Sequence, residues 1–339
     1  MDISTRKKLA GLTMMFVVGI TALCSGTPSA SAQEFKPPVT RNSALRYWIA
    51  FSLMQDPPAN KETAELLNQV ASGKAEWNEE KLGPIIDANR TAILTMQRAT
   101  RLPECDWGVE MELGPAAPIP PYAKARVLGN LNVLYGMREA AHHDMKGAAE
   151  TWLAGVRFAE QMPHGMSLIG TVVGQTVLLA NLRALDAEAV RGGLDENLRA
   201  QVAKAVRAVP EYGFDWSEGW RFETYVMELA MKKMREAPDP KEWYTEASGQ
   251  APPSPFVLPT TTELREFQQL MDEVAEAYSL PYPAAKEKLA GIEPQIARLN
   301  PAITWIIPNP SRSNERRAEV QAERGKLLED LAKVSAKAS

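Results

Sequence analysis

The sequence predicts an all-α protein, an irregular multi-helix bundle or short solenoid of about nine to eleven helices. The prolines are unevenly spaced and leave long proline-free stretches at 122–162, 164–209, 211–237, 260–280 and 311–339. Within these stretches, apolar residues recur every three or four positions, as on one face of a helix. No series of alternating strands stands out, and a short apolar piece such as 302–307 fits a helix or a strand.

The first 32 residues predict a secretory signal peptide. Arg6, Lys7 and Lys8 precede an apolar run over 9–23, and the segment ends in Ala30-Ser31-Ala32, an A-x-A cleavage pattern. We therefore expect an exported chain, periplasmic or extracellular, whose mature form begins near Gln33. The alternative is an uncleaved anchor helix, which would make the chain a membrane-tethered structural protein.

Composition and charge argue against several classes of protein. The 339 residues are 45% apolar and 24% charged, with 38 Lys and Arg against 42 Asp and Glu, which is typical of a globular protein. Removal of residues 1–32 leaves a net charge of −6 and one cysteine, Cys105, so the mature chain has no internal disulfide. An acidic chain disfavours nucleic acid as a partner. We expect Cys105 to pack as a small apolar residue, since Glu104 and Asp106 disfavour its thiolate.

We expect one main helical domain over 33–237, and its first residues, 33–42, are expected to form a loose arm. Its acidic loop contains Glu104, Asp106, Glu110 and Glu112 beside Trp107. One hypothesis gives Asp106 and Glu110 a general acid and base role on a sugar that stacks on Trp107, because glycoside cleavage uses two carboxyl groups. The other hypothesis is a structural loop in which Trp107 and Cys105 fill the core.

The Cys105-Asp106-Trp107-Gly108 segment is followed by Gly114-Pro115, a helical pair over 122–162 and an apolar helix over 163–182. In this combination the chain resembles a group of uncharacterised exported bacterial proteins. The likeness spans 102–209 and extends to Asn300-Pro301. It implies a helical fold and no particular activity.

The helical pair over 122–162 is also similar to one tetratricopeptide (TPR) unit. In such a unit, the positions where the two antiparallel helices approach hold small, small, bulky and small residues. Here these positions are Gly136, Ala148, Trp152 and Gly155. Asn132 and Glu160 depart from the pattern, where the family has an aromatic residue and a proline, and no second copy follows about 34 residues later. The resemblance implies TPR-like antiparallel pairing, and only weakly a peptide-binding role.

The next two features of the main domain have structural interpretations. His142 and His143 fall in the turn of the pair, and no spacing typical of a metal site surrounds them, so we expect neither a metal nor another cofactor. The stretch 165–182 has no charged residue. Because it contains polar residues such as Gln175 and Asn181, we expect a buried central helix and no stable membrane span after signal cleavage.

Aromatic residues crowd 212–225 and are the best candidate binding surface. Trp216 and Trp220 are four apart and share a helix face, whereas Phe222 and Tyr225 form a second pair. We expect one face to be core and the other to contact a peptide or sugar, with Trp107 as a further candidate. Glu218 and Glu223 lie among these rings as candidate catalytic acids.

The segment 238–259 predicts a long proline-rich loop, because six prolines with Gly and Ser over 237–259 break helices. A C-terminal helical segment, 260–339, is expected to pack on the main domain. It starts with a capping box, Thr260 with Glu263. It ends in a helix of mixed charge from Ser311, interpreted as a solvated edge helix or, alternatively, as a partner-binding helix.

The sequence therefore leads to two hypotheses about function. The first is an exported, non-catalytic helical protein that binds a protein or peptide. The second is a periplasmic or secreted hydrolase of glycans that uses Asp106, Glu110, Glu218 or Glu223 beside the aromatic rings. The oligomeric state stays open.

Overall fold

The computed structural model describes residues 39–335, except 59, 166 and 306. The predicted signal peptide and the first part of the predicted arm lie outside the described residues. The chain divides into two units, 1–40 and 41–339, and the described helices belong to the second.

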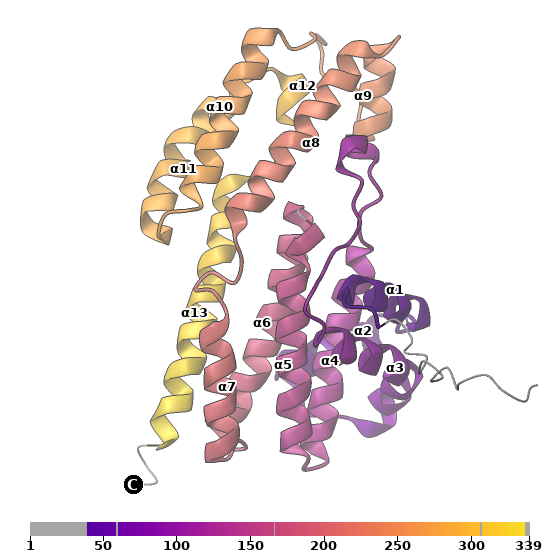
Figure 1. Cartoon of the computed structure of the whole chain (residues 1–339), viewed down its shortest axis with the longest axis vertical. Coiled ribbons are helices and arrows are strands. Elements are labelled where there is room, and N and C mark those ends of the chain that lie inside the picture. The colour runs from indigo at the N-terminus through magenta and orange to yellow at the C-terminus, as the bar shows by residue number, and fades with distance from the viewer. Residues whose placement is uncertain (1–38, 59, 166, 306, 336–339) are drawn as a thin grey trace, which may run out of the picture. The chain divides into compact units, whose positions relative to one another are not determined.

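The second unit is all-α, as the sequence predicts. Within the described residues the only β contact is an isolated bridge between Asn42 and Glu104. The helices, shown in Figure 1, are α1 (Ser43–Leu53), α2 (Lys61–Ala71), α3 (Glu79–Ala99), α4 (Tyr122–Ala141), α5 (Met145–Gln161), α6 (Leu168–Arg191), α7 (Glu196–Ala208), α8 (Trp216–Glu236), α9 (Pro240–Ser248), α10 (Thr261–Ala277), α11 (Tyr282–Ile296), α12 (Pro301–Thr304) and α13 (Pro310–Ser335), with 3-10 helices η2 (Met111–Ala116) and η3 (Pro163–Gly165).

The helices outnumber the predicted nine to eleven partly because short helices form where the sequence predicted a loop or left the choice open. Helix α9 lies inside the predicted loop 238–259. Pro240 occupies its first turn, where a missing N–H costs nothing, and the Asp239 side chain caps the helix by accepting from Lys241 N at 2.9 Å. Pro238 precedes the helix, and the other four prolines of the segment follow Gly249, whose positive φ of 67° ends the helix. The ambiguous stretch 302–307 contributes to α12.

Helix boundaries follow the local signals. The Thr260 side chain accepts from Glu263 N at 3.2 Å while the Glu263 carboxylate accepts from Thr260 N at 2.7 Å, a complete capping box. Gly192 ends α6 in the left-handed region at a φ of 78°. His143, at a φ of 65°, forms the predicted turn between α4 and α5.

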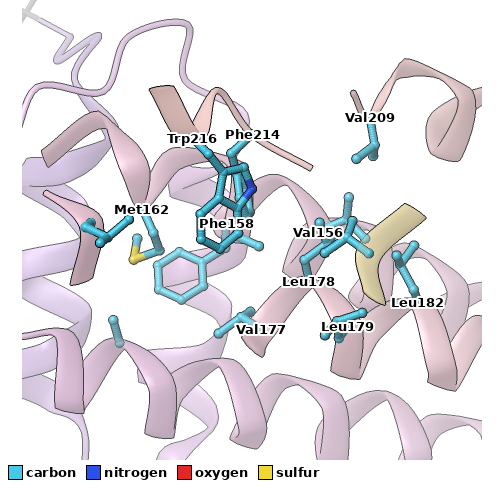
Figure 2. Close-up of a cluster of buried hydrophobic side chains, with 14 of the residues drawn as sticks. Val156, Phe158, Met162, Val177, Leu178, Leu179, Leu182, Val209, Phe214 and Trp216 are labelled. Atoms are coloured by element: carbon cyan, nitrogen blue, oxygen red, sulfur yellow. The ribbon is translucent and has the colours of Figure 1, made fainter. Parts of the chain in front are cut away.

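The core is centred on α4, α5 and α6, which contact one another closely. Small residues permit this approach: a Cβ added to Gly174 of α6 would lie 2.7 Å from the Ala159 carbonyl oxygen of α5, and one added to Gly155 would collide with Asn181. Apolar side chains from α5, α6 and the segment before α8 gather in this core (Figure 2). The two helices over 122–162 thus pair as expected, but the structure gives no confirmation of a specifically TPR-like geometry.

Helix α6 is buried, as the sequence predicts. Among the described helices it is the one long and apolar enough to cross a membrane by composition, and 67% of its apolar window is buried inside the protein. Burial of this kind is typical of a core helix.

Helix α13 differs from the expected solvated edge helix. It packs against α6, α7 and α11, and Figure 1 shows it running beside α7 and α11. Val320, Leu327 and Leu331 of the predicted apolar stripe are buried. Arg317 is buried with them at 1% exposure. The mixed charge of this segment predicted an exposed arginine instead.

Candidate functional site

The carboxylates of the acidic loop do not converge. Glu104 forms an ion pair with Arg41 at 2.7 Å, and the Asp106 carboxylate accepts from the N–H of Gly108 at 2.9 Å. Both acids are exposed, as is Glu110. Glu104 thus holds the loop to Arg41, Asp106 bonds within the loop, and Glu110 faces solvent.

Trp107 lies inside the core. It is 6% exposed and stacks on Tyr47 and Phe51 with ring centroids 5.6 and 6.2 Å away. Its Nε1 donates to the carbonyl oxygen of Gln161 at 3.0 Å. Cys105 packs against the same core, and burial raises the pKa of its thiol to about 11, with the nearby Asp106 charge contributing. Both residues fill the core, as the structural hypothesis for this loop expects.

Most of the aromatic residues singled out on α8 are buried. Trp216 and Trp220 are 1% and 0% exposed, and both stack on Tyr278 of α10, with centroids 6.2 and 5.7 Å away. Phe222 is buried too, whereas Tyr225 is 42% exposed. The two tryptophans share a face, as expected, and that face is the contact between α8 and α10.

The candidate acids on α8 have different surroundings. Glu218 is exposed in the first turn of the helix. Glu223 is partly buried, and its Oε1 accepts from the N–H of Leu168, the first residue of α6, at 3.0 Å. Burial raises the pKa of Glu223, and the Leu168 N–H opposes this only in part. Burial likewise raises the pKa of Tyr122 to about 12, and the Glu223 charge adds to the effect.

Glu223 faces a pocket of about 480 Å³ where the first turns of α6 and α13 meet α8. Helix α6 contributes an apolar wall, Leu168, Ile169 and Val172. Two arginines of α13, four residues apart, lie among the remaining lining residues, Pro308, Asn309, Arg312, Ser313 and Arg316. Asp106, Glu110 and Glu218 are not among the lining residues.

The charges of this pocket are unbalanced. Neither the Arg312 nor the Arg316 guanidinium forms an ion pair or a hydrogen bond within the described residues. Carboxylates nearby are engaged elsewhere: Glu223 accepts from Leu168, and Glu293 accepts from the N–H of Ser311 at 3.1 Å. Two cationic groups are therefore left facing an apolar wall.

A second pocket of similar size, about 470 Å³, lies between α8 and α10. Met231 and Phe267 contribute apolar surface to it. Its charged residues are of both signs, Glu228, Lys232, Arg235 and Glu236. This pocket therefore has no bias toward one sign of ligand.

An exposed apolar face lies on α1. Leu45, Trp48, Ile49 and Leu53 are 55%, 45%, 53% and 44% exposed, at the spacing of one helix face. Large exposed apolar patches mark interaction surfaces more often than single exposed residues do.

The sequence indicated one residue of the α6, α8 and α13 pocket, Glu223, and missed its arginines. The available signal was the spacing of Arg312 and Arg316, which places two like charges on one face. Within the described residues, no group of three His, Cys, Asp or Glu side chains is placed to hold a metal ion. Comparisons with protein-family models, with curated proteins and with solved structures give no match.

Proposed function

We propose that this chain is an exported, non-catalytic helical protein that works by binding a protein or peptide through the pocket formed by α6, α8 and α13. The observation that carries this proposal is the pair of guanidiniums, Arg312 and Arg316, which lie beside an apolar wall and have no partner among the described residues. Arginine binds carboxylates in a planar, two-pronged geometry, and apolar contacts add affinity. The exposed face of α1 supports the same class of function, because such faces are typical of contacts with other proteins.

The glycan hydrolase has less support. Hydrolysis of a glycoside needs two carboxyl groups about 5 to 10 Å apart. Glu223 is the single carboxylate among the described residues that line this pocket. The acids of the 104–112 loop lie outside its lining.

Binding is tested by fluorescence polarisation of the purified chain with labelled short peptides that combine acidic and apolar residues. We expect saturable binding that weakens by about tenfold in Arg316→Ala and as the salt concentration rises. The matched control is Arg235→Ala in the α8 and α10 pocket, which should bind as the wild type does. The proposal is wrong if no peptide binds, or if the control variant loses affinity equally. Release of reducing ends from a glycan would favour the hydrolase.

Export is proposed from the N-terminal sequence. The intact mass of the chain recovered outside the cytoplasm should match a protein that begins near Gln33. A mass that retains residues 1–32 would favour a membrane-tethered form.

A further inference from the structure

We propose that the pocket selects a free C-terminal carboxylate on a peptide whose last residue is apolar. This inference rests on the proposed peptide binding and specifies its ligand. Three features of the pocket support it: the occupied backbone N–H groups, the volume of the pocket, and the position of Glu223.

Three backbone donors near the pocket are already bound within the protein. The Leu168 N–H donates to Glu223, the Ser311 N–H donates to Glu293, and the Arg312 N–H donates to the Asn309 side chain at 2.7 Å. Phosphate sites at helix ends use free N–H groups, and these three are occupied. An incoming anion therefore meets the Arg312 and Arg316 side chains, whose planar donors match a carboxylate.

The apolar wall lies in the same pocket as these arginines. Ile169 is 54% exposed, unusually open for an isoleucine, and Leu168 and Val172 lie beside it in the lining. A pocket of about 480 Å³ is within the range of small-ligand sites and too small for a helix or a folded domain. It fits one or two residues of an extended chain, with the terminal side chain against Ile169.

Glu223 sets the number of negative charges that the pocket accepts. Its carboxylate belongs to the lining, and no cationic side chain in the described part of the chain is bound to it. An acidic side chain on the last residue would add a second negative charge near Glu223, and like charges repel in a partly desolvated site. The ligand therefore has one carboxylate, at its end, and an apolar side chain.

The test compares three acetylated peptides that differ at one end only: Ala-Ala-Leu with a free acid, the same peptide as an amide, and Ala-Ala-Asp with a free acid. Affinities are measured by titration calorimetry at constant ionic strength. We expect the amide and the Asp peptide to bind about tenfold or more weakly than the Leu acid. Arg312→Ala and Arg316→Ala should lower affinity for the Leu acid and leave the amide unaffected, since the lost interaction is with the carboxylate.

Two further variants complete the design. Glu223→Gln should raise affinity for the Asp peptide by removing the repulsion, and Arg235→Ala should change nothing. Equal binding of acid and amide overturns this inference and leaves the proposed peptide binding intact. If no peptide binds, including those with internal acidic residues, both this inference and the proposed peptide binding are wrong. Tighter binding of decanoate or inorganic phosphate than of the Leu acid shows that a fatty acid or a phosphate is the ligand, and also overturns the inference.

Discussion

Helix α13 has arginines in two contrasting environments. Arg317 is buried, donates to the carbonyl oxygens of Tyr278 and Leu280, and lies over the Tyr212 ring at 4.1 Å from its centroid. Arg312 and Arg316, at the start of the same helix, have no such partners within the described residues. Arginine therefore belongs to the core on one face of α13 and lines a pocket on another, even though Arg316 and Arg317 are adjacent.

The difference lies in the acceptors that neighbouring helices offer. Tyr278 is the residue that ends α10, where helix carbonyls lack partners. Arg324 likewise binds carbonyl groups at the C-terminal end of a helix. It donates to the carbonyl oxygens of Val206 and Val209, at the end of α7, at 3.1 and 3.0 Å. A buried arginine is tolerated where helix C-termini supply oxygen atoms and a favourable dipole. The start of α13 faces the first turns of α6, where the helix carbonyls are bonded within the helix, so its arginines find no helix carbonyl there.

The largest effect should follow the loss of the buried arginine. Arg317→Ala leaves the carbonyls of Tyr278 and Leu280 without a donor and opens a cavity under the Tyr212 ring. We expect the free energy of unfolding to fall by about 3 kcal/mol. Urea denaturation followed by far-ultraviolet circular dichroism measures it.

Arg317→Met is the matched control for volume. Methionine fills most of the space but donates no hydrogen bonds. It should therefore restore the free energy of unfolding lost to the cavity, but not the part lost because the carbonyls of Tyr278 and Leu280 have no donor. If Arg317→Ala costs less than about 0.5 kcal/mol, the residue behaves as a surface residue and the contrast within α13 does not hold.

A smaller effect tests whether Glu223 is coupled to the arginines of the pocket. Burial raises the pKa of Glu223, so its contribution to stability is complete below the pKa of the unfolded chain and is lost as the pH rises through the folded pKa. Glu223→Gln should therefore raise the free energy of unfolding at pH 7, and the gain should shrink as the pH falls toward about 4.3.

The sign of this difference is decisive. An ion pair between Glu223 and Arg316 would lower the pKa of the acid, and Glu223→Gln would then destabilise the protein at pH 7. Denaturation of both proteins from acid to neutral pH distinguishes the two outcomes. Comparison with the wild type cancels the other acids whose pKa burial raises, such as Glu139 and Glu160.

The sequence predicted the helical fold because the signals for it are local. The capping box at Thr260, the Gly192 stop and the turn at His143 each act within a few residues. Helix α9 departs from the predicted loop because its proline, Pro240, stands in the first turn, where a helix tolerates proline. The burial of α13 has no local signal, because the two acceptors of Arg317 lie 39 and 37 residues away in the chain.

The candidate site was predictable only in part for the same reason. Glu223 was among the indicated acids, but its pocket is completed by α13, about ninety residues later in the sequence. Trp216 and Trp220 were proposed as a binding surface because aromatic rings suit cores and ligand sites equally well. Their burial against Tyr278 depends on α10, which no local pattern in 212–225 reveals.

The smallest effect on stability should come from the two arginines of the pocket. Arg312 is exposed and Arg316 partly buried, and neither guanidinium has a partner within the part of the chain that the structure describes. Arg312→Ala and Arg316→Ala should therefore each change the free energy of unfolding by less than about 0.5 kcal/mol. Denaturation under the conditions used for Arg317→Ala measures it. A residue whose loss leaves the fold intact but abolishes binding of a peptide acid has its role outside the core. A destabilisation comparable to that of Arg317→Ala would instead show that these arginines support the fold, and the distinction within α13 would disappear.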